Sequence, residues 1–232
     1  MSAYYVDTAG DDGNSGESEL LPWLTVSHAQ TALTGDQHDN SLLFKCGCTW
    51  REQFTVGCSG TLGHPFTINS YSTGAKPIIK GSDIQTGFAD QGSNVWDVAL
   101  TTEPKGVWFS GVVGTLAASK AAITGVRQWF WASNVLSVYG TSDPSGTIEA
   151  CVRDRVIQIS GKSYVTVIGL DTSHANVNLV NLSTSNYCIV SANYIHDSPK
   201  GCVGIWQGTA THTIQNNEIA RSGQGNAGSS RS

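Results

Sequence analysis

Short apolar runs separated by Gly, Ser, Asn and Asp recur along most of the chain. The clearest rows are residues 164–173, 187–198 and 212–222. When these rows are aligned, Leu170, Ile195 and Ile219 fall 25 and 24 residues apart. A repeat of this period, made of short strands and tight turns, predicts a solenoid whose coils bury their apolar side against the next coil.

The N-terminal part of the chain predicts a covered first coil. Trp23, Val26, Ala29 and Leu33 recur at helical spacing, so we expect a short amphipathic helix over the open end of that coil. An uncovered coil would present free backbone donors and acceptors to other strands. Strand-like runs between residues 41 and 80 then predict the first coils.

Residues 81–148 depart from the repeat and predict β-hairpins inserted into the solenoid. We expect residues 95–99 to pair with 106–109, and residues 128–131 with 135–139. Alternation along the third of these runs would bury Trp129 and Trp131 and leave Phe130 as an exposed ring that could stack on a sugar.

The opening residues 4–16 and 22–25, together with residues 44–52 and 68–79, resemble the pectate-lyase-like superfamily, which includes polysaccharide lyases, some glycoside hydrolases and phage tailspikes. The resemblance implies an all-β fold, a right-handed parallel β-helix solenoid with a short N-terminal capping helix and β-hairpin inserts. The single domain would comprise a strand and cap helix (1–40), first coils (41–80), a hairpin insert (81–148), regular coils (149–222) and a flexible tail (223–232).

Charge narrows the choice of partners. The chain has 232 residues, 13 Lys and Arg against 18 Asp and Glu, and a net charge of −5. A nucleic-acid partner would call for a basic stripe, so we do not expect one. An acidic polysaccharide would have to be met by a local cluster of Arg and Lys. No apolar run of about 18 residues occurs, which argues against a membrane span.

No cofactor is predicted. The six cysteines lack the paired spacing of a zinc site, and we expect most of them to be buried free thiols. Asp11 and Asp12 suggest calcium, but a calcium site takes more oxygen ligands than these two carboxylates provide, so a solvated turn is favoured.

One edge of the regular coils gathers ionisable residues. Equivalent positions in successive coils form columns about 4.8 Å apart. The alignment places Asp171 in the column of His196, and Asp197 beside Arg221. His174 and Lys200 follow in the next turns, and this edge is the predicted site.

Three interpretations of that edge remain open. In a polysaccharide lyase His196 or Lys200 would act as the base, Arg221 would bind the substrate carboxylate, and Asp171 would orient His196. In a hydrolase Asp171 and Asp197 would be the pair of carboxylates. In an ordinary surface ladder the Asp197–Arg221 ion pair would contribute at most about 1 kcal/mol.

Further residues are candidates for substrate binding. Arg153 and Arg155 would point the same way on a strand and could hold an acidic sugar or only flank the core. With Phe130 and His174 they complete the predicted binding set. The Arg-x-x-Pro-x-x-Arg and Trp-Ile-Asp-His patterns of pectate lyases are missing, as are the Gly-His-Gly and Arg-Ile-Lys patterns of polygalacturonases.

Two functions of different classes are therefore predicted. The first is a carbohydrate-engaging β-helix module, of polysaccharide lyase or tailspike-like depolymerase type, that acts on or binds an acidic glycan. The alternative is a non-enzymatic virion protein, a capsid decoration or tail component, which uses the β-helix as a rigid scaffold. Partners would be a polysaccharide or protein subunits, including a homo-oligomer through the open C-terminal coil. The first residues do not resemble a signal peptide, so we expect a virion or a cytoplasm-made protein rather than a classically secreted one.

Overall fold

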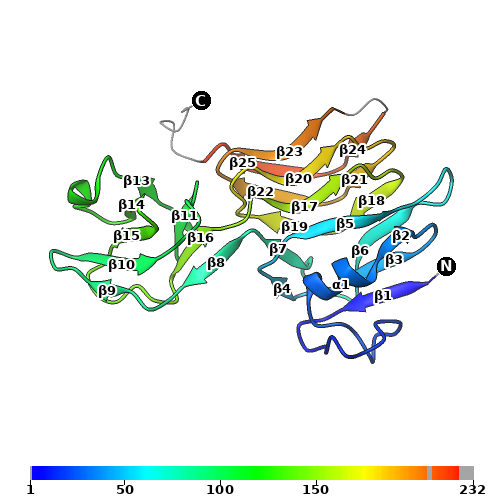
Figure 1. Cartoon of the computed structure of the whole chain (residues 1–232), viewed down its shortest axis with the longest axis horizontal. Coiled ribbons are helices and arrows are strands. Elements are labelled where there is room, and N and C mark those ends of the chain that lie inside the picture. Colours follow the sequence, from blue (N-terminus) through cyan, green and yellow to red (C-terminus); the bar gives the residue numbers. More distant parts are fainter. Residues whose placement is uncertain (1, 208–210, 225–232) are drawn as a thin grey trace.

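The computed structural model describes residues 2–207 and 211–224. Three parallel sheets surround one interior, and in successive coils the chain passes from sheet A to sheet C to sheet B (Figure 1). Sheet A contains β1 (Ala3–Val6), β3 (Ser41–Lys45), β6 (Phe66–Tyr71), β18 (Val165–Ile168), β21 (Ile189–Ser191) and β24 (Thr213–Gln215). Sheet B contains β2 (Thr34–Asp36), β5 (Phe54–Ser59), β17 (Arg155–Ser160), β20 (Asn178–Ser183) and β23 (Gly201–Trp206). Sheet C contains β4 (Thr49–Trp50), β7 (Ile78–Lys80), β19 (Asp171–Ser173), β22 (Tyr194–Ser198) and β25 (Glu218–Ser222).

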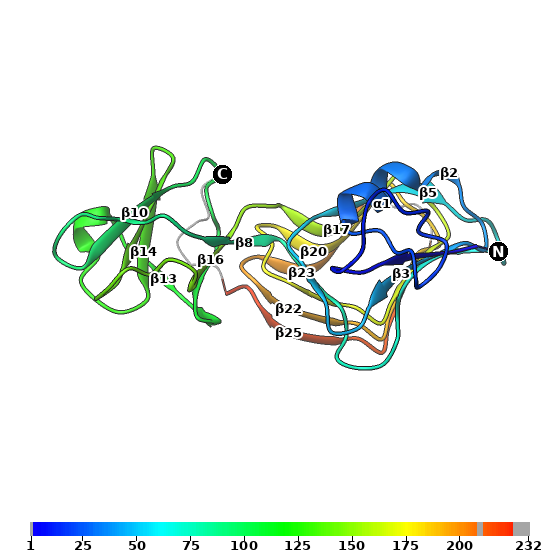
Figure 2. The ribbon, with the colours of Figure 1, turned by 90° about the horizontal axis from the view of Figure 1, so that it is seen from below.

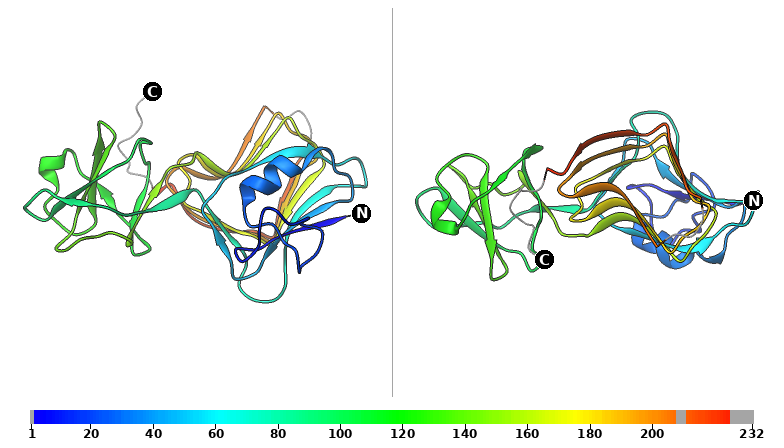
Figure 3. Two further views of the ribbon diagram at one scale, coloured as in Figure 1. Left: turned by 60° about the horizontal axis from the view of Figure 1, so that its bottom comes forward. Right: turned by 90° about the horizontal axis from the view of Figure 1, so that it is seen from above.

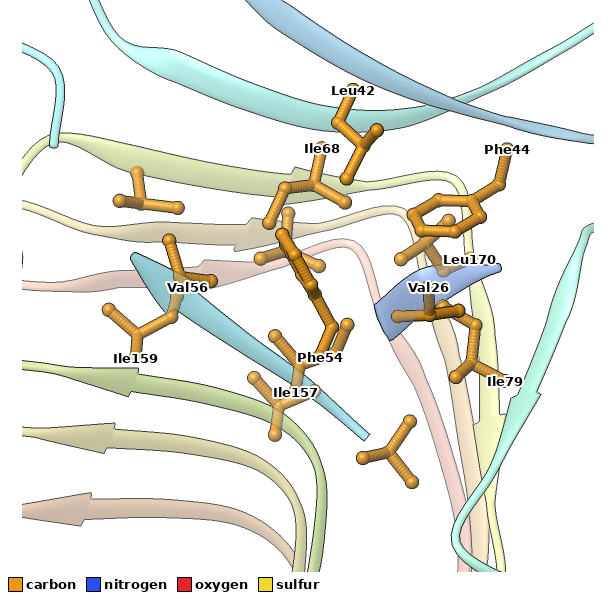
Figure 4. Packing of buried hydrophobic residues seen from close by; sticks show 14 of the residues in the cluster. Val26, Leu42, Phe44, Phe54, Val56, Ile68, Ile79, Ile157, Ile159 and Leu170 are labelled. Atoms are coloured by element: carbon orange, nitrogen blue, oxygen red, sulfur yellow. The ribbon is translucent and has the colours of Figure 1, made fainter. Parts of the chain in front are cut away.

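Alternating side chains of the three sheets fill the interior. On β5, for example, Phe54, Val56 and Cys58 are buried while the residues between them are half-exposed. Figure 4 shows Leu42 and Ile68 of sheet A facing Phe54 across this core. Burial of each such side chain contributes about 1.5–3 kcal/mol to stability. The parallel solenoid predicted from the repeats is confirmed.

The predicted cap is also present. The helix α1 (Val26–Ala32) begins at Thr25, whose side chain accepts a hydrogen bond from the backbone N–H of His28. Its apolar residues Val26 and Ala29 join the same core, and Figure 4 shows Val26 there. The helix therefore closes the first end of the solenoid.

A ladder of asparagine side chains holds the turn from sheet A to sheet C. Asn193 Nδ2 donates to Asn217 Oδ1 at 3.0 Å and to the carbonyl oxygen of Val167 at 3.0 Å. Asn193 Oδ1 accepts the backbone N–H of Leu170, so one amide satisfies backbone groups that no strand pairs. The ladder bonds each coil to the next at the same bend.

The register of sheet C corrects the sequence alignment. Thr172, not Leu170, lies beside Ile195, and Ser173 lies beside His196. The alignment lengthened the first repeat by two residues because it matched the serines that follow the strands. Asp171 pairs with Tyr194 and is therefore a diagonal neighbour of His196 rather than a member of its column.

Between β7 and β17 the chain leaves the solenoid and forms two small sheets, antiparallel except for the pair β13–β14, which project from its side (Figures 1 and 2). One contains β8 (Ser82–Gln85), β11 (Val107–Phe109), β12 (Val112–Val113) and β16 (Ile148–Cys151). The other contains β9 (Ala89–Asp90), β10 (Val95–Ala99), β13 (Thr115–Leu116), β14 (Gln128–Ala132) and β15 (Val135–Tyr139), with a 3-10 helix, η1 (Lys120–Ala122), beside it. We call residues 82–151 the insert.

The two predicted hairpins have different outcomes. β14 and β15 pair antiparallel across Ser133 and Asn134, both with positive φ, as predicted. The prediction that residues 95–99 pair with 106–109 is wrong, because β10 pairs with β9 and β15 while β11 pairs with β12 and β16. None of the helices in the described residues has the length and apolar character needed to cross a membrane. Most of the predicted tail, residues 225–232, lies outside the described residues.

Candidate functional site

Except for Phe130, which lies in the insert, the predicted residues gather where sheet C ends and sheet B begins. His174, Asp197 and Arg221 occupy equivalent positions in three successive coils at the end of sheet C. Their backbones are left-handed, with φ of 60°, 55° and 50°, which costs an L-residue about 1 kcal/mol and turns the chain at the same place in each coil. We call this edge, residues 171–178, 194–201 and 218–222 with residues 153–155, the C–B corner. It can be followed from two sides in Figure 3.

His196 lies between two carboxylates at this corner. Its Nε2 is 2.8 Å from Asp171 Oδ1, and its Nδ1 is 2.5 Å from Asp197 Oδ2. Burial of the ring lowers the pKa of His196, but the hydrogen bonds to Asp171 and Asp197 outweigh it and raise the pKa above its ordinary value. Each ring nitrogen therefore lies within hydrogen-bond distance of a carboxylate oxygen, and Nδ1 is also 3.0 Å from Arg221 Nη2.

This geometry bears on the predicted roles. A general base needs a free lone pair within reach of the substrate proton. In this arrangement both nitrogens of His196 lie against the Asp171 and Asp197 carboxylates, so neither nitrogen faces a position that a substrate could take. The arrangement therefore favours neither His196 as a base nor the two aspartates as a hydrolytic pair.

Arg221 closes the cluster on its exposed side. Its Nε donates to Asp197 Oδ1 at 2.6 Å, and its Nη2 donates to Asp197 Oδ2 and to the Tyr194 hydroxyl, each at 2.8 Å. The Tyr194 ring stacks on His196 with centroids 3.9 Å apart. Burial raises the pKa of Asp197, but the hydrogen bonds from Arg221 and His196 outweigh it and hold the pKa below its ordinary value. The sequence reasoning missed Tyr194, although it is two residues before His196 and so shares its face of β22.

A second ionic cluster joins the insert to the solenoid. Glu149 of β16 accepts two hydrogen bonds from Arg51, each at 3.0 Å, and two from Lys80, each at 3.2 Å. Ser82 Oγ also donates to Glu149 at 2.9 Å. Burial raises the pKa of Glu149, but the hydrogen bonds from His174 and Arg51 outweigh it and hold the pKa far below its usual range. No sequence signal singled out this cluster.

His174 belongs to that second cluster and not to an open binding surface. It is buried, its Nδ1 is 3.0 Å from Glu149 Oε2, and its ring stacks on Trp108 of the insert with centroids 4.0 Å apart. Burial lowers the pKa of His174 more than the Glu149 hydrogen bond raises it. The partners of His174 in this structure thus come from the protein, and its contact with substrate stays a prediction.

The remaining cations at the corner differ in their partners. Arg153 pairs with Asp83 of the insert at 2.7 Å. Arg155 is half-buried, and its Nε is buried without a hydrogen-bond partner. Lys200 is exposed, and its ammonium group makes no ion pair with the part of the chain that the structure describes. Two positive charges at the corner are thus uncompensated by the residues described.

Two further candidate residues make contacts within the protein. Phe130, predicted as an exposed ring, is half-buried and packs against the small cluster of Val95, Ala117 and Ile123, because β13 and η1 lie beside its strand. Asp12, considered as a calcium ligand, instead accepts hydrogen bonds from the backbone of Leu24 and Thr25.

No protein-family model matches the chain. The chain is 28% identical over 89 residues to the lacto-N-biosidase of Bifidobacterium longum, a match that covers 36% of this chain and 6% of that protein.

Among solved structures, the complex of XylC with xylose has a TM-score of 0.74 and 18% identity, covering 87% of this chain and 41% of that one. Pectate lyase Pel9A has a TM-score of 0.53 and 15% identity, covering 94% of this chain and 39% of that one. The chain thus spans less than half the length of these relatives. The three parallel sheets, the capped first coil and these likenesses together show that the chain has a parallel β-helix fold.

Proposed function

We propose that the chain is a carbohydrate-engaging β-helix module that binds an acidic glycan at the C–B corner. Proteins of similar fold include XylC, solved in complex with xylose, and pectate lyase Pel9A. The relative found by sequence is a lacto-N-biosidase. The fold alone does not select a ligand, so the argument rests on the residues of the corner.

The observation that carries the proposal is the pair of uncompensated cations. Arg155 and Lys200 have no ion-pair partner among the described residues, although the chain as a whole has a net charge of −5. Of the other charged side chains of the corner, Asp171, Asp197 and Arg221 bind one another or His196. Arg153 pairs with Asp83 of the insert. A uronate carboxylate would complete the hydrogen bonds of an arginine in the geometry that guanidinium groups favour.

Cleavage is a weaker expectation than binding. His196, Asp171 and Asp197 are occupied with one another, which leaves Lys200 as the predicted base whose side chain has no partner among the described residues. A lyase activity at this corner would therefore depend on Lys200 and not on His196. Lyase cleavage gives an unsaturated product that absorbs in the ultraviolet. Measuring this absorbance on polygalacturonate with wild type and Lys200→Gln separates cleavage from binding alone.

The binding experiment compares trigalacturonate with neutral xylotriose by titration calorimetry. We expect the acidic oligosaccharide to bind more tightly than the neutral one. Arg155→Gln and Lys200→Gln should each weaken the binding of trigalacturonate about tenfold, because a charge-assisted hydrogen bond contributes about 1.5–3 kcal/mol. Asp154→Asn is the matched control: it lies between Arg153 and Arg155, is exposed, and should not weaken binding when its negative charge is removed.

Equal binding of the two oligosaccharides, or affinities that the Arg155 and Lys200 variants leave unchanged, would rule out the acidic-glycan proposal. The virion scaffold and a homo-oligomer through the last coil stay predictions, since no contact of the described residues favours them.

A further inference from the structure

The insert lines one side of the C–B corner over three successive coils. Arg153 forms an ion pair with the insert at 2.7 Å. Asn176, at the equivalent position of the next coil, accepts the backbone N–H of Lys105 at its Oδ1 over a distance of 2.8 Å. One coil further, a Cβ added to Gly106 would lie 2.7 Å from Pro199 Cγ, so the insert packs directly against that ring. The insert therefore forms a wall along this side of the corner.

The residues that follow these three contacts along the chain form a row parallel to the solenoid axis. They are Asp154, Val177 and Lys200. The N–H of Val177 donates to the Asp154 carbonyl oxygen, and the N–H of Gly201 donates to that of Val177. The row therefore advances by one coil spacing, about 4.8 Å, at each step. Asp154 and Lys200 are exposed and Val177 is half-buried. We call this row the corner strip.

The two uncompensated cations lie at opposite ends of the corner strip. Arg155 belongs to its first coil and Lys200 to its third. Sheet B pairs Arg155 with Asn178 and Asn178 with Gly201, so the two cations are two coils apart. Two coil spacings amount to about 10 Å. The coil between them presents Val177, which carries no charge, at this position.

Both cations can be reached from solvent. Lys200 is exposed. Among the three guanidinium nitrogens of Arg155 only Nε is buried without a hydrogen-bond partner, and the side chain as a whole is half-buried, so its two Nη atoms lie at the surface. A carboxylate in solution can therefore approach either cation.

The wall formed by the insert decides how an extended glycan can lie at this corner. Across the corner the glycan would run into the insert, whereas along the corner strip it can pass all three coils. A pyranose ring is about as long as one coil spacing, so three successive sugars span the strip. The first and third sugars then lie at Arg155 and Lys200. The middle sugar lies over Val177, whose apolar side chain offers a ring face contact but no counter-charge.

We propose that the C–B corner recognises carboxylates on the first and third of three successive sugars, with the glycan lying along the solenoid axis. The assignment rests on the proposed function and specifies its ligand, a glycan whose uronates are separated by one residue that is itself charged or neutral. Arg155 and Lys200 each bind one carboxylate. Because both contacts belong to one ligand, the second forms at a high effective concentration, and a ligand too short to reach both cations loses that gain.

The test compares four ligands by titration calorimetry on the whole chain. They are digalacturonate, trigalacturonate, and trigalacturonate carrying a methyl ester on its middle residue or on an end residue. We expect trigalacturonate to bind about tenfold more tightly than digalacturonate, because the shorter ligand meets one cation at a time. The middle ester should bind within about twofold of trigalacturonate, since no cation faces that residue. The end ester should bind no more tightly than digalacturonate.

Two variants move the second cation. Lys200→Gln should bind digalacturonate and trigalacturonate equally. Adding Val177→Lys to Lys200→Gln places a cation one coil from Arg155, so digalacturonate should bind about tenfold more tightly than to Lys200→Gln alone. Val177→Gln in the same background is the matched control and should bring no gain.

The outcomes separate the spacing from the proposed function. If digalacturonate binds as tightly as trigalacturonate, and both bind more tightly than xylotriose, the spacing is wrong while the acidic-glycan proposal stands. A loss as large for the middle ester as for the end ester would also overturn the spacing. If none of the acidic oligosaccharides binds more tightly than xylotriose, the proposed function fails and the spacing fails with it.

Discussion

Tyr194 and His196 leave the same face of β22 and stack at a centroid distance of 3.9 Å, with an angle of 20° between their rings. The stacked pair covers one side of the imidazole, while Asp171 and Asp197 bind its two nitrogens. His196 thereby bridges two coils, and because its partners raise its pKa above the ordinary value, its effect on stability should depend on pH.

The first prediction concerns that pH dependence. The folded-state pKa of His196 is raised above its unfolded value, so its contribution to stability is fully present below the unfolded pKa and is lost as pH rises through the folded pKa. Thermal unfolding of wild type and His196→Gln should therefore differ more at about pH 5.5 than at about pH 9. A difference that is the same at both pH values would show that the ring contributes only by packing.

The second prediction concerns the junction between the insert and the solenoid. Glu149→Gln leaves Arg51 and Lys80 without their shared anion, and we expect a loss of about 3 kcal/mol in the free energy of unfolding. Urea denaturation measures it. Glu103→Gln is the control, because its ion pair with Lys105 is more exposed and should contribute less than about 1 kcal/mol. Equal losses in the two variants would contradict the proposed importance of Glu149.

The third prediction concerns the asparagine ladder. Asn193→Ala removes the partners of the Leu170 N–H and the Val167 carbonyl at a buried turn, so we expect a loss of about 2–4 kcal/mol. Asn217→Ala, at the equivalent but more exposed position of the last coil, should lose less. Denaturant titration of the two variants decides the point, and a larger loss at Asn217 would refute the ladder argument.

The fourth prediction concerns the space beside Asn178. Gly204→Ala puts a methyl group 2.6 Å from Asn178 Oδ1, which forces the amide to move and should cost about 1–3 kcal/mol. Gly125→Ala is the control, because the nearest atom to its added Cβ is 3.9 Å away. Calorimetric melting of both variants tests the packing. A Gly204 variant as stable as the Gly125 variant would mean that Asn178 has room to give way.

The solenoid could be predicted from the sequence because period-two alternation of apolar residues identifies its strands. Four apolar residues at helical spacing identify the cap. The Asp171–His196 contact was predicted from an alignment that was two residues out of register. The contact survives the error because a diagonal neighbour on the same face of a sheet still lies within reach of a long side chain.

The second ionic cluster was not predicted from the sequence, and the reason is its long separation along the chain. Glu149 and Arg51 lie 98 residues apart, and their contact depends on how the insert folds back on the solenoid. The same folding buries His174 under Trp108. Packing within the insert itself covers part of Phe130. The burial of both Val156 and Ile157, which are adjacent on a strand of sheet B, could not be predicted either. Two adjacent apolar residues show no break in a row of strand-forming residues.

The central claim is that the uncompensated cations of the C–B corner bind an acidic glycan. Calorimetric titration of the whole chain with trigalacturonate, at low and at high salt, tests it most directly. We predict binding that weakens at high salt, as expected for a carboxylate held by exposed cations, and that is stronger than binding of xylotriose. Equal affinity for the two oligosaccharides, without any dependence on salt, would contradict the account.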